Sequence, residues 1–216
     1  MDPNLSMHHM CRAVRHWKER LVATDGVGTD IPPAVVTLAG PTVVGAYDLD
    51  IVKGLARDAS VVAAIALSDC DRAVICYEAY IDPTGGGSPG DLAPRFATGD
   101  PDVEEAVVLN FVTRDGYSTS RTFPYTYAAG RKVRWKPPAV PLDVGQAQLS
   151  RQVQMMREGF ARQADRGTPP VLNPGTQLHV VGEETTEHGA LVSFAVTAPC
   201  PCGSQRPIEQ CCAKWN

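Results

Sequence analysis

The chain has 216 residues, of which 44% are hydrophobic and 20% charged, and its formal net charge is −4. This is ordinary globular composition, which argues against a disordered chain, and the length suits one sizeable domain or one domain with a small appendage. The negative net charge argues against a protein that binds nucleic acid through bulk electrostatics. Arginine outnumbers lysine fifteen to five, and this bias is typical of GC-rich genomes, which points to a bacterial or phage source.

The sequence also carries information about the compartment. No apolar run reaches the about 18 residues that a transmembrane helix needs, so we expect no membrane association. The first 17 residues contain His8, His9 and Arg12 and lack the apolar stretch of a secretory signal. We therefore expect a cytoplasmic protein, whose seven cysteines are thiols or metal ligands rather than disulfides.

The first part of the chain alternates helical and strand-like patterns. Apolar periodicity and turn signals predict, in order, a helix, two strands joined by a Gly-Pro turn, a helix and a strand, over residues 4–22, 34–38, 42–47, 49–68 and 72–81. The strand–helix–strand order at the end of this series favours a right-handed parallel crossover.

The second part begins with a segment, residues 82–103, that is rich in Gly, Pro and Asp and predicts a long flexible loop. An Asp-Gly pair between two β-rich runs is a strong hairpin signal. The remaining patterns predict this hairpin, a short strand, a helix and two further strands, over residues 105–113, 117–127, 132–136, 146–165, 177–181 and 190–197.

These elements predict an α+β fold with a mixed, mainly antiparallel sheet flanked by about three helices. We expect the α+β domain to span residues 1–170. A β-hairpin over residues 171–198 would connect it to a small zinc-binding knuckle over residues 199–216.

The knuckle is predicted from four cysteines near the end of the chain, Cys200, Cys202, Cys211 and Cys212. Their spacing is C-x-C, eight residues, C-C, which suits the four tetrahedral ligands of one structural Zn²⁺. Disulfides within either pair would close small strained rings, and disulfides between the pairs would need an oxidising compartment. Four thiolates also suit an iron–sulfur cluster, so the spacing alone leaves the metal open.

The string Cys-Pro-Cys-Gly-Ser followed by Cys-Cys, over residues 198–214, closely resembles the SEC-C motif. This motif is the zinc-binding tail of the SecA preprotein translocase ATPase and recurs in many other bacterial proteins. The resemblance implies a knuckle that binds zinc and docks a protein partner, such as a chaperone or the ribosome. Lysines and an aromatic residue usually lie between the cysteine pairs, whereas this chain has Arg206, Pro207, Ile208, Glu209 and Gln210.

We therefore expect a zinc-containing cytoplasmic binding or adaptor protein that contacts its partner through Arg206, Ile208 and Trp215. Ile208 and Trp215 suit equally a packing role against the strands beside the knuckle. Nucleic acid is not expected as a partner, and no motif identifies a small-molecule ligand. Two alternatives stay open. One is an enzyme of unknown chemistry with a site near residues 82–103, where Asp82, Asp100 and Glu104 are candidates. The other is a phage or mobile-element protein that inhibits a host factor.

Several other titratable residues allow a plain structural interpretation. Cys11 and Cys76 fall on apolar faces and are expected to be buried. Cys70 lies between two aspartates, which is a poor setting for a reactive thiol. His179 and His188, with three glutamates between them, suit either a second metal or acid–base cluster or a solvated turn.

Overall fold

The computed structural model describes residues 3–40, 42–53, 57–84, 89–137, 146–165, 192–195, 205–207 and 210–211. Their helices and strands follow the order α1 (Pro3–Asp25), β1 (Ala34–Ala39), β2 (Thr42–Lys53), α2 (Arg57–Ala66), β3 (Arg72–Ile81), α3 (Pro89–Ala97), β4 (Glu104–Thr113), β5 (Ser118–Ala128), β6 (Lys132–Trp135), α4 (Gln146–Asp165) and β7 (Val192–Ala195).

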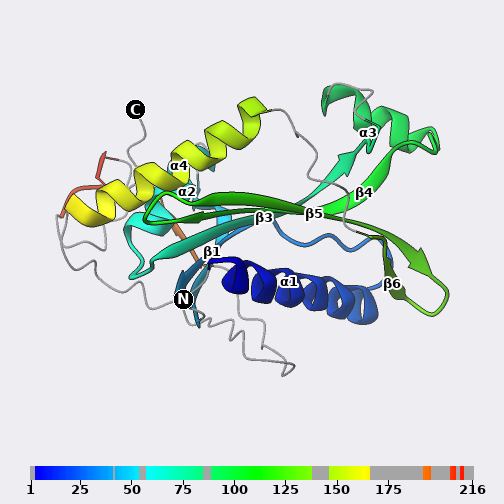
Figure 1. Cartoon of the computed structure of the whole chain (residues 1–216), viewed down its shortest axis with the longest axis horizontal. Coiled ribbons are helices and arrows are strands. Elements are labelled where there is room, and N and C mark those ends of the chain that lie inside the picture. Colours follow the sequence, from blue (N-terminus) through cyan, green and yellow to red (C-terminus); the bar gives the residue numbers. More distant parts are fainter. Residues whose placement is uncertain are drawn as a thin grey trace.

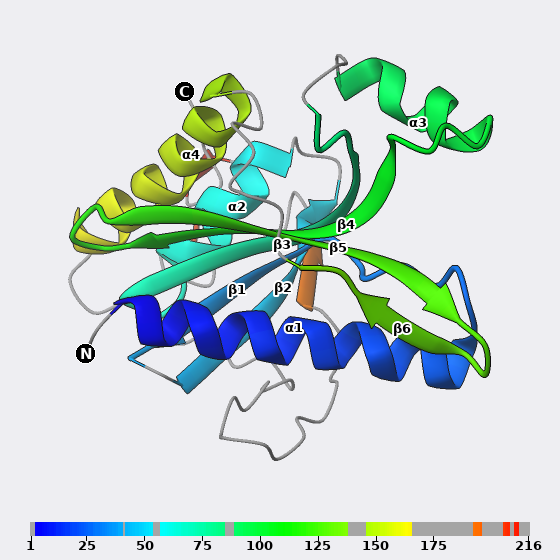
Figure 2. The ribbon, with the colours of Figure 1, turned by 45° about the vertical axis from the view of Figure 1, so that its right-hand side comes forward.

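Six strands form a curled antiparallel sheet in the order β6-β5-β4-β3-β1-β2, and β7 pairs in parallel with β2 at its edge. Helix α1 covers one face of the sheet, whereas α2 and α4 cover the opposite face (Figures 1 and 2). Helix α3 lies beside the far ends of β3 and β4 (Figure 1). The expected α+β class with a mainly antiparallel sheet is confirmed, and the described part of the chain contains four helices rather than three.

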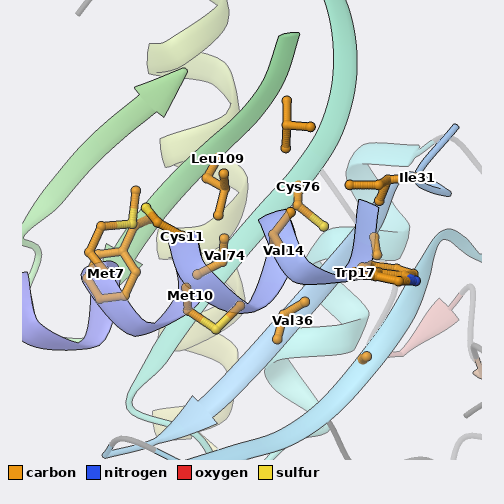
Figure 3. Close-up of a cluster of buried hydrophobic side chains, with 14 of the residues drawn as sticks. Met7, Met10, Cys11, Val14, Trp17, Ile31, Val36, Val74, Cys76 and Leu109 are labelled. Atoms are coloured by element: carbon orange, nitrogen blue, oxygen red, sulfur yellow. The ribbon is translucent and has the colours of Figure 1, made fainter. Parts of the chain in front are cut away.

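The core under α1 is built from a stripe of apolar side chains spaced three and four residues apart, as the periodicity predicts. These side chains pack against inward-facing residues of the central strands (Figure 3), and the cluster includes Met7, Met10, Cys11, Val14, Trp17, Val36, Val74, Cys76 and Leu109. At the other edge of this face Trp135 of β6 donates a hydrogen bond to Glu19, with Nε1 and Oε1 2.6 Å apart. The sheet therefore curls around α1.

The second core lies between the sheet, α2 and α4. Every residue of α2 from Ala59 to Ala66 is buried, because α4 covers the side of α2 that faces away from the sheet. Gly159 of α4 lies so close to α2 that a Cβ atom there would be 2.7 Å from Cβ of Ile65. The side chain of Gln163 donates a hydrogen bond to the carbonyl of Cys70 at 3.0 Å, which ties α4 to the turn before β3.

The helix predicted over residues 49–68 is wrong in its first part, because β2 continues to Lys53 and α2 begins only at Arg57. The segment gains partners on both sides. At its start the Leu49 N–H donates to the carbonyl of Pro33, just before β1, at 2.9 Å, and its end pairs with β7, where Val52 lies opposite Phe194. Strands β2 and β3 both run antiparallel to β1 between them, so they are parallel to each other, as a crossover through α2 requires.

The flexible loop predicted over residues 82–103 is also wrong in part, because it contains α3. Proline suits the first turn of a helix, where its missing N–H costs nothing, and Pro89 occupies that position. The ring of Phe96 stacks on Tyr80 of β3 with the centroids 4.5 Å apart. Arg95 binds two aspartates outside the helix. These contacts with residues outside the helix stabilise a helix that the local composition does not predict.

The remaining local predictions within the described residues are confirmed. The β4–β5 hairpin closes with a hydrogen bond from the Thr113 N–H to the Tyr117 carbonyl at 2.9 Å, and Gly116 has the positive φ of 94° that this turn requires. Strand β6 and helix α4 lie where they were predicted, and β7 lies within the strand expected over residues 190–197. The boundary near residue 170, the strand over residues 177–181, His179 and His188 fall outside the described residues.

Candidate functional site

Three cysteines are buried in the main body of the protein, which consists of strands β1 to β6 and helices α1 to α4. Burial raises the pKa of Cys11 to about 11 and that of both Cys70 and Cys76 to about 12. Because the thiolate is both the nucleophile and the metal ligand, thiols with such pKa values remain protonated and inert near neutral pH. The expectation that Cys11 and Cys76 are buried is confirmed.

Of the predicted knuckle, only a few residues are described. Cys200, Cys202, Cys212, Ile208 and Trp215 lie outside the described residues.

Cys211, by contrast, is described, is partly buried and packs against the core cluster of α2 and α4. The N–H of the preceding residue, Gln210, donates to the Pro207 carbonyl at 2.9 Å, and Arg206 is exposed. Among the described residues no group of three or more His, Cys, Asp and Glu side chains is arranged to hold a metal. The four-thiol donor set at the chain end fits zinc by its chemistry alone.

The candidate acids of the 82–103 segment are held in ion pairs. Arg95 donates through Nη1 to Asp82 at 2.8 Å and through Nε to Asp100 at 2.7 Å. Hydrogen bonds from Thr84 and Arg95 lower the pKa of Asp82 to about 2, and Arg95 also lowers the pKa of Asp100. Both carboxylates are therefore ionised near neutral pH and anchor α3.

The third candidate acid, Glu104, does not join Asp82 and Asp100 in their ion-pair network. Its carboxylate accepts a hydrogen bond from Lys136 Nζ at 2.6 Å, which links the start of β4 to the end of β6. The structure thus uses all three carboxylates to connect neighbouring elements.

A buried charged cluster, which no sequence motif indicates, lies between α1 and the sheet. Lys18 has no exposed side-chain area, and its Nζ lies 2.8 and 3.0 Å from the two carboxylate oxygens of Glu78. The same Nζ donates to the Thr29 carbonyl at 2.6 Å. Glu78 also accepts hydrogen bonds from the Tyr125 hydroxyl at 2.6 Å and from the Ile31 N–H at 2.8 Å.

The geometry of the Lys18–Glu78 cluster indicates a structural role. The ammonium group lies 4.8 Å from the ring centroid of Tyr125, so its charge is balanced by a carboxylate, a carbonyl and an aromatic face. Burial raises the pKa of Glu78, even though Lys18 and Tyr125 donate hydrogen bonds to it. A carboxylate enclosed by three donors and a lysine without exposed area have little freedom to meet a substrate, so the cluster fixes α1 to the sheet.

The opposite face of the sheet contains a cavity of about 330 Å³, which is within the range of small-molecule sites. Its lining comes mainly from β2, α2, β3 and α4, and it combines aliphatic residues with two arginines, one aspartate, one glutamate, a tyrosine and a glutamine. The lining residues include Leu49, Arg57, Asp58, Val61, Ile75, Tyr77, Arg151, Gln152 and Met155. None of them belongs to a sequence motif, because four separate elements bring them together.

Within the described residues, no helix is long and apolar enough to cross a membrane. No family model matches the chain, and no curated protein or solved structure matches it.

Proposed function

We propose that this protein is a zinc-containing cytoplasmic adaptor, whose C-terminal knuckle binds one Zn²⁺ through Cys200, Cys202, Cys211 and Cys212 and docks a protein partner. The observation that carries the proposal is the division of its seven cysteines into two groups. Three are buried thiols with raised pKa values in the main body. The other four gather within positions 200–212, where their spacing suits a tetrahedral metal.

The place of Cys211 supports a knuckle that is attached to the main body. Its side chain packs against the α2–α4 core cluster, so a metal bound there would lie beside this helical layer. In proteins of this kind zinc acts as a structural cross-link, which holds short segments that have too few apolar residues to fold by themselves. We infer that zinc orders the last residues of the chain.

The role that suits such an ordered tail best is the binding of a protein partner. The main body has two apolar clusters of its own, one on each face of the sheet, so it has little need of a metal for stability. A surface held rigid by zinc loses little conformational entropy when it binds. We propose that Arg206, Ile208 and Trp215 form this surface. The enzyme alternative near residues 82–103 is weakened, because Asp82, Asp100 and Glu104 are held in ion pairs.

The zinc site can be tested by metal analysis combined with thiol counting. We expect about one zinc per chain and no visible absorbance in the purified protein. After chelation four thiols should react rapidly with a thiol reagent, which is the seven of the sequence minus the three that are buried. In denaturant all seven should react.

Variants separate the two groups of cysteines in the same assay. Cys202→Ser should abolish zinc retention, whereas Cys11→Ala, which changes a buried thiol on α1, should leave the zinc content unchanged. Bound iron, zinc retained by Cys202→Ser, or rapid reaction of the α1 and β3 thiols in the folded protein would contradict the proposal.

A further inference from the structure

We propose that the cavity between β2, α2, β3 and α4 binds a small organic anion with an apolar body, such as a medium-chain or aromatic carboxylate. The proposal does not rest on the zinc knuckle. The inference rests on the size of the cavity, on its apolar wall and on the charges that line it.

The apolar wall of the cavity is formed by Leu49, Val61, Ile75 and Met155. Val61 and Ile75 have at most 1% of their surface exposed, so they are fixed by the packing of the core around them. A preformed apolar wall of this kind favours the body of an aliphatic or aromatic ligand, since a ligand that enters it leaves water without forcing the side chains to rearrange.

The lining supplies cationic hydrogen-bond donors for an anion. Arg57 and Arg151 both line the cavity, and Arg151 also donates to the carboxylate of Asp58. Glu78 also belongs to the lining, but Lys18 binds its carboxylate with a separation of 2.8 Å, so its charge is already balanced. Arg57 and Asp58 are the first two residues of α2, and the N-terminal end of a helix adds further positive potential.

Two contacts hold the polar side chains in place before any ligand binds. Arg151 donates through Nε to Asp58 Oδ2 at 2.7 Å, and its Nη2 donates to the same oxygen. Gln152 accepts a hydrogen bond from the buried amide of Asn110, which leaves the NH₂ group of Gln152 as the polar group it offers a ligand. Guanidinium and amide donors on an apolar wall are the combination that recognises a carboxylate.

The first test uses 1-anilinonaphthalene-8-sulfonate, an aromatic anion, as a fluorescent probe of the whole protein. We expect saturable binding at about one site per chain and displacement by octanoate. The neutral N-phenyl-1-naphthylamine should bind about tenfold more weakly, because it lacks the anionic group. Failure of saturable binding, or equal affinity for the neutral probe, would overturn the proposal.

Three charge variants locate the site. Arg151→Gln should weaken probe binding about tenfold, whereas Arg157→Gln removes the same charge from another exposed position of α4 and should have no effect. Asp58→Asn should strengthen binding several-fold, because it removes the carboxylate that competes with the ligand for Arg151. Opposite effects of Arg151→Gln and Asp58→Asn distinguish a ligand site from a structural ion pair, whose loss would act in one direction. Equal effects of Arg151→Gln and Arg157→Gln would place the probe elsewhere and overturn the assignment.

The variant Leu49→Trp tests independently whether the probe binds against the apolar wall of the cavity. The larger side chain should fill the cavity from its partly exposed side and abolish probe binding, while the thermal unfolding of the protein stays close to that of the wild type. Undiminished probe binding by a folded Leu49→Trp variant would show that the probe does not occupy this cavity.

Discussion

At the scale of single residues, Lys18 and Glu78 form a buried ion pair between α1 and the sheet. The two side chains have 0% and 11% of their area exposed, and their charged atoms lie 2.8 Å apart. Taking two charges out of water is costly, and their attraction offsets this cost only because Thr29, Ile31 and Tyr125 supply the remaining hydrogen bonds. Removing one partner therefore leaves an uncompensated buried charge.

We predict that Lys18→Met lowers the free energy of unfolding by about 3 kcal/mol, because Glu78 then stays buried without its cation. The double variant Lys18→Met with Glu78→Gln should recover part of this loss, since it removes both charges. Lys132→Met, at an exposed position of β6, serves as the control and should change stability by less than about 0.5 kcal/mol. Urea denaturation measures all of these values. Simple additivity of the Lys18 and Glu78 substitutions would show that the pair is not coupled.

At the scale of the elements, the contact between α2 and α4 depends on one glycine. Gly159 lets the two helices approach until a Cβ would lie 2.7 Å from Ile65 Cβ and 3.2 Å from the Val62 carbonyl oxygen. Val62 and Ile65 are both fully buried between the sheet and α4, so neither can move away easily. The glycine is therefore required for the spacing of this helical layer.

We predict that Gly159→Ala destabilises the protein by about 1–3 kcal/mol, because the added methyl group overpacks the helix interface. The sign of the change in stability is informative, because alanine is a better helix former than glycine by about 1 kcal/mol and would stabilise a helix without this close contact. Gln154→Ala, at an exposed position of the same helix, is the matched control and should be nearly neutral. Thermal or urea unfolding measures the stability of both variants. A Gly159→Ala variant that is more stable than the wild type would refute the close contact.

At the scale of the whole molecule, the chain combines a main body and a cysteine-rich end. The main body has apolar cores on both faces of its sheet, whereas the cysteine-rich end has too few apolar residues to form a core. Apolar clusters lie on both faces of the sheet, and Cys211 is the described point at which the cysteine-rich end meets the α2–α4 layer. In the proposed adaptor, the main body provides stability and the knuckle provides the contact surface.

We predict that changing Ile208 to Asp together with Trp215 to Ala reduces partner capture from the native host about tenfold or more. Zinc content and the melting of the main body should stay nearly unchanged, because neither substitution removes a cysteine. Val27→Asp places the same charge on a side chain of the main body that is 54% exposed, and it should not affect capture. Loss of zinc in the double variant would show that these side chains pack the knuckle. Persistent capture would place the partner surface on the main body.

The elements that the sequence determined by itself are those with strong local signals. Helices α1 and α4 each carry a long apolar stripe, and the β4–β5 hairpin has an Asp-Gly pair that suits its turn. The buried settings of Cys11 and Cys76 follow from the same periodicity. In each case the conformation depends on residues within a few positions of one another, so the pattern is sufficient.

The tertiary structure alone decided the rest, because the contacts involved join distant parts of the chain. Helix α3 depends on the stacking of Phe96 against Tyr80 and on the aspartates that Arg95 binds. The extension of β2 depends on β1 and β7 as partners. In the sequence, Lys18 falls on the apolar stripe of α1. Glu78 follows Val74 and Cys76, the residues of β3 that face α1, at the same two-residue spacing. Each is therefore visible in the sequence as a charged residue at a position where the pattern predicts burial. Only the packing of α1 on the sheet brings these two charges together, and their contact offsets the cost of burying each of them.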